Sequence, residues 1–268
     1  TMKKAKKMAL QAMVCAAFAA AMVLAGCTTE EGGDSDMIQL DGNNATIDAD
    51  NTTEYENRRG FKSAGKTRWS EAAYEITIDE STGNNVMGFM FNESENTDST
   101  KNFFLFGVRL NSDKTGLDAY LSYFPNVDEK KNLTSNVNTF YSSEAASQEE
   151  TIMKGSGKND AYFPLVSGQK RVIIHVTQEK AGELDNDPYV YVVKAYKSIS
   201  ADGTLTDEIT LTENGAKSLR DYPNTGKTGK WDNYMGFYAN VKKGKYLKGS
   251  WKGLDKMLVT AVEVAEAE

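Results

Sequence analysis

The chain has 268 residues, a formal net charge of −7 at pH 7 and two cysteines. An acidic balance of this size opposes binding to nucleic acid or to an anionic membrane surface through charge alone. Two cysteines exclude a disulfide-rich framework, so the hydrophobic residues, 40% of the chain, must supply a core that carries the stability.

Residues 1–26 have the composition of an export signal. Four lysines precede an apolar run over residues 8–25, which ends in Leu24-Ala25-Gly26-Cys27. A positive segment, an apolar segment and small residues at a cleavage site are typical of a signal peptide; a transmembrane helix over residues 8–25 is the alternative. Leu24-Ala25-Gly26-Cys27 resembles the lipobox of bacterial lipoproteins at all four positions. The resemblance implies a mature protein that begins at a lipid-bearing Cys27 and is anchored in the bacterial cell envelope, at the outer membrane or cell surface.

Removal of the signal changes the charge and the thiol content of the protein. Four of the 31 basic residues leave and none of the 38 acidic ones, so the mature net charge is −11. Cys15 leaves with the signal and Cys27 carries lipid, which leaves no free thiol and no disulfide. Residues 27–36 are polar and acidic and predict a flexible tether. Residues 37–268 then form a single domain.

Short runs of Val, Ile, Tyr and Phe separated by polar turns follow the tether, and they predict β-strands. In residues 69–78, for example, Tyr74, Ile76 and Ile78 fall on one face. No long apolar pattern of helical period follows the signal, so we predict an all-β antiparallel β-sandwich or barrel. The predicted strands are residues 69–78, 86–92, 103–110, 117–124, 171–178, 189–196, 208–211, 234–241 and 257–264.

The segments between these strands differ in length. Residues 111–116 predict a hairpin loop between two strands, while the polar stretches 125–165 and 213–233 predict long loops at the rim. Residues 87–92 (Met-Gly-Phe-Met-Phe-Asn) are echoed by residues 235–240 (Met-Gly-Phe-Tyr-Ala-Asn). This echo predicts two inner-sheet strands whose glycines let another backbone or a bulky side chain approach.

The order of the strands resembles that of concanavalin A-like, laminin-G-type jelly rolls. Residues 88–91 and 102–109 resemble the central hairpin of those domains, and residues 234–239 resemble a strand near their end. Residues 171–176 and 189–193 resemble the hairpin that carries a small loop. The similarity covers roughly residues 65–265 and implies a jelly-roll sandwich in which residues 257–264 pair beside residues 69–78.

Catalytic motifs are weak in this chain. Glucan-hydrolysing members of the family carry a Glu-x-Asp-x-x-Glu motif, which places its carboxylates on one face of a strand. Glu183 and Asp185 match its first two acids, but Pro188 occupies the third position and the run falls in a predicted turn. His175, the single histidine, lies inside a predicted strand, and no Gly-x-Ser-x-Gly elbow is present. We therefore expect that this protein is not an enzyme, and a glycoside hydrolase is the least favoured alternative.

Metal-binding patterns are limited to oxygen ligands. Clusters of His and Cys, which transition metals prefer, are absent. Calcium binds carboxylate and amide oxygens, and the candidate calcium ligands are Asp185, Asn186 and Asp187, with Asp41, Asn43 and Asn44 as a second run. No cofactor is expected to be required.

Aromatic and polar side chains on one strand face form the candidate binding site. In residues 117–124, alternation puts Asp118, Tyr120, Ser122 and Phe124 on one side, and Arg109 lies on the preceding strand. Sugar rings stack on aromatic rings, while Arg, Asp and Asn bind sugar hydroxyls. An alternative is that Trp69, Trp231 and Trp251 pack in the core or cap its ends. The predicted ligand-binding residues are Arg109, Asp118, Tyr120, Phe124, Trp231, Asp232 and Asn233.

Together these patterns favour a lipid-anchored surface protein whose jelly roll binds carbohydrate, or a host or matrix component, without cleaving it. The alternative is a structural subunit that contacts another envelope protein through sheet edges and residues 125–165. The expected partners are the membrane, through the lipid on Cys27, and a glycan or a surface protein, but not nucleic acid. The functional part of this expectation rests on analogy of fold.

Overall fold

The computed structural model describes residues 37–52, 57–63, 71–95, 101–127, 150–153, 162–184, 189–213, 218–221 and 235–254. The predicted signal, the tether and Cys27 lie outside these residues. Over the described ranges, no helix has the length and apolar character needed to cross a membrane.

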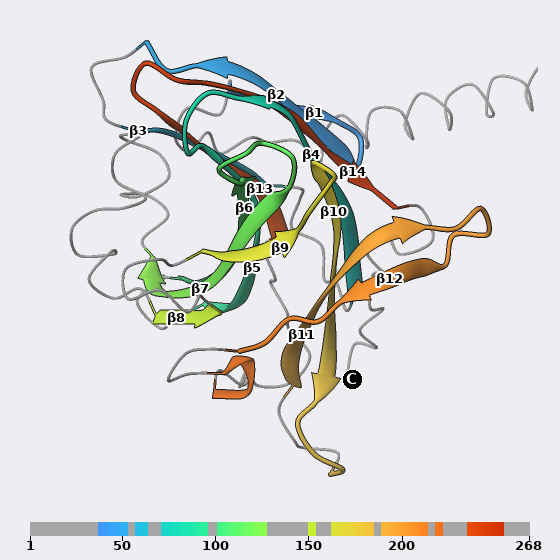
Figure 1. Ribbon diagram of the computed structural model, residues 1–268. Helices are drawn as coiled ribbons and strands as arrows, with labels where there is room; N and C mark the ends of the chain where they lie inside the picture. Colours follow the sequence, from blue (N-terminus) through green and yellow to red (C-terminus); the bar gives the residue numbers. More distant parts are fainter. Residues whose placement is uncertain are drawn as a thin grey trace, which may run out of the picture. The chain divides into compact units, whose positions relative to one another are not determined.

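Two antiparallel sheets form the fold (Figure 1). Sheet A has the strand order β3-β13-β5-β6-β7-β8, and β9 pairs with β7 beside β8. Its strands are β3 (Asn57–Ser63), β5 (Val86–Glu95), β6 (Lys101–Leu110), β7 (Leu117–Val127), β8 (Glu150–Met153), β9 (Phe163–Val166) and β13 (Met235–Lys242).

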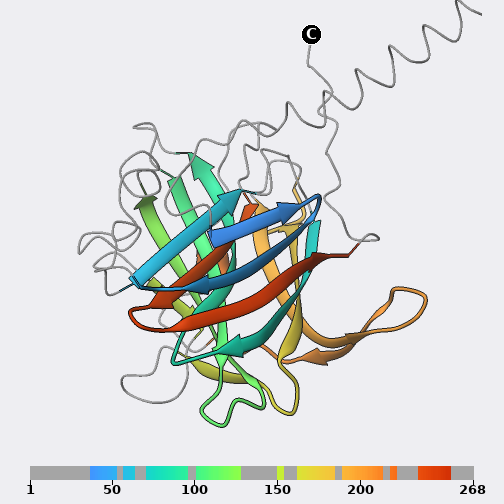
Figure 2. The ribbon, with the colours of Figure 1, turned by 90° about the horizontal axis from the view of Figure 1, so that it is seen from above.

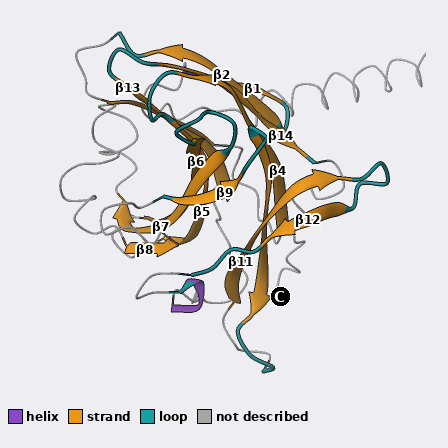
Figure 3. Ribbon diagram, viewed as in Figure 1, coloured by secondary structure: helices purple, strands orange, loops and turns teal. Residues whose placement is uncertain are grey.

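Sheet B has the strand order β1-β2-β14-β4-β10-β11-β12. Figure 2 shows the ribbon of Figure 1 turned by 90° and seen from above. Figure 3 shows that strands dominate the described chain, with the short 3-10 helix η2 (Leu219–Asp221) as an exception. The strands of sheet B are β1 (Ile38–Asp41), β2 (Asn44–Asp50), β4 (Glu71–Ser81), β10 (Arg171–Lys180), β11 (Tyr189–Ile199), β12 (Leu205–Ile209) and β14 (Tyr246–Gly253).

The chain passes repeatedly between the two sheets. It enters sheet A at β3, returns to sheet B at β4, and crosses again before β5, β10, β13 and β14. These crossings confirm the predicted all-β antiparallel sandwich, in which each sheet buries one face against the other.

The strand that returns beside β4 differs from the predicted one. β4 pairs with β10 on one side and with β14, Tyr246–Gly253, on the other. The prediction that residues 257–264 take this place is therefore wrong, although those residues themselves lie outside the described chain. The lysines and glycines of β14 lower its apparent β-propensity, yet its burial alternates along the strand, because successive side chains point to opposite faces of the sheet.

Two predicted loops contain regular structure. The stretch 125–165 includes the end of β7 and the strands β8 and β9, and η2 lies within residues 213–233. The predicted strand 208–211 is displaced, since β12 spans Leu205–Ile209. The polar sequence around β8 and β9 hid these two strands, whose partner β7 is distant in sequence.

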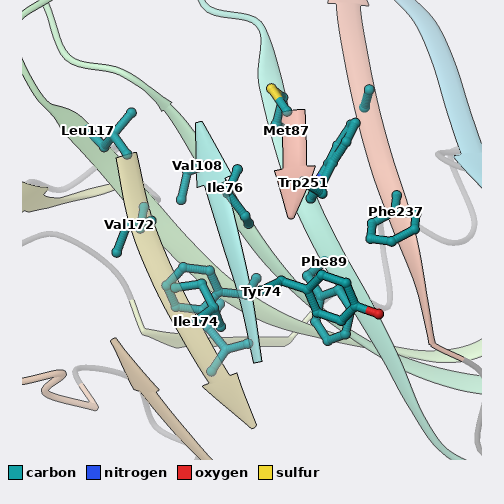
Figure 4. Close-up of a cluster of buried hydrophobic side chains, with 14 of the residues drawn as sticks. Tyr74, Ile76, Met87, Phe89, Val108, Leu117, Val172, Ile174, Phe237 and Trp251 are labelled. Carbon is teal, nitrogen blue, oxygen red and sulfur yellow. The ribbon is translucent and has the colours of Figure 1, made fainter. Parts of the chain in front are cut away.

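The core between the sheets is rich in aromatic side chains from both layers (Figure 4). The two echoed segments are inner strands of sheet A, as predicted. They are also neighbours, with Phe89 of β5 opposite Phe237 of β13 in register. Tyr74 of β4 packs against both rings, with centroids 5.0 and 5.3 Å away. The indole N–H of Trp251, in sheet B, donates a 2.9 Å hydrogen bond to the carbonyl of Gly88 in sheet A, which joins the layers directly.

Candidate functional site

The side chains of β7 alternate between the two faces of sheet A. Leu117, Ala119, Leu121 and Tyr123 point into the sandwich core, as the alternation predicts. The outer face carries a second apolar cluster, and Tyr162, just before β9, packs against it. The members of this outer cluster are Val86, Met90, Leu105, Tyr120, Phe124 and Tyr238.

Two paired glycines, the glycine row, leave a gap between side chains in the middle of the outer face. Gly88 of β5 is opposite Gly107 of β6, and these two glycines are flanked in register by Tyr238 on β13 and Tyr120 on β7. The Tyr120 ring lies directly over Gly107, because a Cβ there would meet Tyr120 Cζ at 2.7 Å. Glycine at position 107 thus creates the space in which the Tyr120 ring rests.

Next to this row lies a polar cluster of three side chains from three elements, Arg109, Asp118 and Tyr162. Arg109 Nη2 is 3.6 Å from Asp118 Oδ2, across the β6–β7 pair where the two residues are in register. The guanidinium carbon of Arg109 lies 3.6 Å from the centroid of the Tyr162 ring, in a cation–π contact. Tyr162 in turn meets Tyr120 edge-on at 4.8 Å.

The cluster is partly open to solvent. The side chains of Arg109 and Asp118 are 18% and 21% exposed, and Tyr162 is half-buried. Such partial burial restrains the side chains and strengthens their electrostatic interactions relative to a fully hydrated pair. The arrangement offers donors, acceptors and one aromatic ring within a small area of the sheet face.

Arg109 and Asp118 lie close to the turn of the β6–β7 hairpin. Asn111 Oδ1 accepts hydrogen bonds from the backbone N–H groups of Thr115 and Gly116, at 3.1 and 3.0 Å. Asp113 accepts from the N–H and the hydroxyl of Thr115, at 2.9 and 2.6 Å, and these bonds lower the pKa of the Asp113 carboxyl. The predicted loop 111–116 is thus a closed turn that fixes the register of the strands carrying the site.

Polar atoms of the outer face include two without a hydrogen-bond partner. Ser122 Oγ on β7 and Asn240 Oδ1 on β13 are both buried and unpaired. Ser122 follows Tyr120 on the same face, and Asn240 follows Tyr238, so these atoms lie on either side of the glycine row. A buried polar atom without a partner is costly, and a ligand hydroxyl is one group that would relieve this cost.

The structure sorts the predicted binding residues into three groups. Arg109 and Asp118 come together as described. Tyr120 and Phe124 share their face, but they are 5% and 1% exposed, so the prediction that their rings are open to a sugar is corrected: both rings are buried. Trp231, Asp232 and Asn233 lie outside the described residues.

Tyr162 was missed by the sequence analysis. It falls in the polar stretch 125–165, and its place beside Arg109 follows from the pairing of β9 with β7, which no local pattern reveals. The mid-strand glycine at position 107 marks the close approach of the Tyr120 ring, and it carries no signal for Tyr162.

The remaining predictions fall on sheet B or outside the described chain. His175 is half-buried on β10, and its Nε2 is 2.7 Å from Glu71 Oε1. Glu183 is exposed in the turn after β10, away from any strand face. The candidate calcium ligands Asp185, Asn186 and Asp187 are not described, and Asn44 Oδ1 accepts a 3.0 Å hydrogen bond from the Gly253 N–H. In the described ranges, no three His, Cys, Asp or Glu side chains are grouped as a metal site would require.

Comparison with known proteins gives structural likenesses at low identity. No family model and no curated protein matches the chain. A native glycosidic hydrolase covers 84% of this chain and 85% of its own, with 8% identity and a TM-score of 0.34. The transglycosylase Crh5 covers 82% and 71%, with 11% identity and a TM-score of 0.29.

A third similar structure is a β-porphyranase from the human gut bacterium Bacteroides plebeius. It covers 85% of this chain and 80% of its own, with 10% identity and a TM-score of 0.28. At these values no side chain of the present protein takes a role from a matched one, so the role of each residue rests on the geometry described above.

Proposed function

We propose that this protein binds carbohydrate without cleaving it, through Arg109, Asp118 and Tyr162 on the outer face of sheet A. In the proposal, a lipid on Cys27 holds the domain at the surface of the bacterial envelope. The observation that carries it is the guanidinium of Arg109, held between the Tyr162 ring and the Asp118 carboxylate on a partly exposed sheet face.

The chemistry of the cluster suits a neutral sugar. Guanidinium N–H groups donate hydrogen bonds and carboxylate oxygens accept them, so adjacent hydroxyls of one sugar find both kinds of partner. Arg109 and Asp118 are pre-positioned by a closed hairpin and by the Tyr162 ring. Pre-positioning supports binding because less side-chain freedom is lost when the ligand arrives.

The same cluster supports a catalytic role less well than it supports sugar binding. Retaining and inverting glycosidases use two carboxyl groups on either side of the scissile bond, about 5–5.5 or 6.5–9.5 Å apart. The cluster described here has a single carboxylate, Asp118, and its neighbour is a guanidinium rather than a second acid. This arrangement favours recognition over bond cleavage in our proposal.

The direct test is a glycan array probed with the full-length chain, solubilised in a detergent that has no sugar headgroup. We expect binding to a defined set of neutral glycans, and Arg109→Met should weaken it by at least about tenfold, or 1.4 kcal/mol. Arg171→Met is the matched control, since Arg171 Nη1 lies 3.6 Å from Glu75 Oε2, the same separation, in the other sheet. Absence of binding to any glycan, or equal binding by Arg109→Met, would overturn the proposal.

A further inference from the structure

We propose that Asp118 makes this site selective for neutral glycans and excludes anionic sugars such as uronates. The inference rests on the proposed function and specifies its ligand class. Arginine alone would favour carboxylates and sulfates, because its planar fork binds them with two parallel hydrogen bonds. Tyr162 and Asp118, which contact Arg109, shift this preference away from anions in our proposal.

The Tyr162 ring and the Asp118 carboxylate both limit how a ligand reaches the Arg109 guanidinium. One face of the group is covered by the Tyr162 ring, 3.6 Å from the guanidinium carbon. Along its edge, Nη2 faces Asp118 Oδ2 at 3.6 Å. A ligand that approaches this edge of Arg109 therefore also approaches the carboxylate, and a negatively charged ligand is repelled where a hydroxyl can donate a hydrogen bond.

The strand pairing holds Asp118 in this position from both sides. It is in register with Arg109 on β6 and with Pro164 on β9. Its side chain is 21% exposed, as against 18% for Arg109, so solvent screens the repulsion less than it would between fully hydrated charges. The net charge of the chain, −7, has the same sign as Asp118 and adds to the effect at long range.

Arg109 and Asp118 carry opposite charges, so this pair offers no net attraction to an anion. The pair still presents both kinds of hydrogen-bonding group, because a guanidinium is a donor and a carboxylate is an acceptor. Like-charge placement against the wrong ligand is a common source of specificity in binding sites. Asp118 is thus a specificity-determining residue, in addition to a contact for hydroxyl groups.

Titrations with a matched pair of oligosaccharides test this inference. The pair consists of a neutral oligosaccharide that binds on the array and the same molecule oxidised at one C6 position to a uronate. The full-length wild type should bind the neutral form at least tenfold more tightly. Asp118→Asn, which keeps the shape and one acceptor oxygen, should reduce this ratio by about tenfold, mainly through tighter binding of the uronate. Glu75→Gln, in the Arg171 pair of sheet B, should leave the ratio unchanged.

A second measurement needs no variant. Because the discrimination is electrostatic, the wild-type ratio should decrease as sodium chloride is raised from 20 to about 500 mM. If the wild type binds the neutral form but its ratio is the same in Asp118→Asn and at high salt, the inference fails and the proposed function stands. If the wild type binds the uronate more tightly, the inference also fails. If it binds neither form nor any other glycan, both are overturned.

Discussion

Gly107 leaves the space in which the side chains that support the candidate site pack. The Tyr120 ring occupies the space over Gly107, the Tyr162 ring meets it edge-on at 4.8 Å, and Arg109 lies on Tyr162. Tyr120 thus packs over Gly107, Tyr162 packs against Tyr120, and Arg109 packs against Tyr162. Tyr120 is buried, and we assign it a positioning role: it supports Tyr162 rather than contacting a ligand.

Replacement of Gly107 by alanine tests this chain of contacts. A Cβ would meet the Tyr120 ring, with Cζ at 2.7 Å, and forcing the ring aside should cost about 1–3 kcal/mol of unfolding free energy in urea titrations. Glycan affinity should fall in parallel, because Tyr162 and Arg109 lose their support.

The appropriate control is a double-mutant cycle. In a Tyr120→Ala background the same Gly107→Ala change has no ring to displace, so its cost should largely vanish. Equal costs in the two backgrounds would show that Tyr120 does not depend on the space at position 107.

Among the elements, the β6–β7 hairpin contributes most to the site. It brings Arg109 and Asp118 into register and closes through Asn111, Asp113 and Thr115. Gly116, at its end, lies so close to β9 that a Cβ would meet Ser167 Cα at 2.9 Å. The hairpin is therefore held by its own turn and by the neighbouring edge strand.

Asn111→Ala should loosen this hairpin. Two backbone N–H groups lose their acceptor, and we expect a loss of about 1–2 kcal/mol in the free energy of unfolding. Amide hydrogen exchange should also become faster at residues 114–117 than elsewhere in sheet A. Ser112→Ala, an exposed position in the same loop, serves as the control; if both variants lose the same stability, the Asn111 bonds are not what closes the turn.

The elements that sequence patterns reveal are those with strong local alternation. Tyr74, Ile76 and Ile78 marked β4, and the alternation in β7 placed Tyr120 and Asp118 on the correct face. The strands β2 and β14 escaped prediction because Asn and Asp in β2, and Lys and Gly in β14, lower their apparent β-propensity, although burial alternates along both strands. Edge strand β9 and residue Tyr162 depend on pairing with β7, a non-local contact that composition does not encode.

At the scale of the whole molecule, the two sheets pack on a shared core, where Tyr74 of sheet B contacts Phe89 and Phe237 of sheet A. It is 2% exposed, and burial raises the pKa of its hydroxyl to about 12. Below pH 10 this group is neutral in both the folded and the unfolded chain. Above pH 10 the unfolded chain ionises first, so the free energy of unfolding falls as the pH rises from 10 to 12.

Tyr74→Phe tests this pH dependence. From the shift of about two pH units, the wild type should lose about 2–3 kcal/mol more than the variant between pH 9 and pH 12, as followed by urea unfolding. Tyr246→Phe is a useful comparison, since the pKa of Tyr246 is also raised to about 12, but by its hydrogen bond to Asp48 at an exposed site. Identical slopes for the wild type and Tyr74→Phe would contradict the assignment.

The most direct measurement combines binding and chemistry in one sample. The full-length protein is incubated with an end-labelled oligosaccharide from the array, binding is quantified by equilibrium dialysis, and the recovered sugar is analysed by mass spectrometry. We predict saturable binding that Arg109→Met weakens by at least about tenfold, and a recovered oligosaccharide of unchanged mass. Shortened or transferred products that disappear with Arg109→Met or Asp118→Asn would contradict non-catalytic recognition at this site.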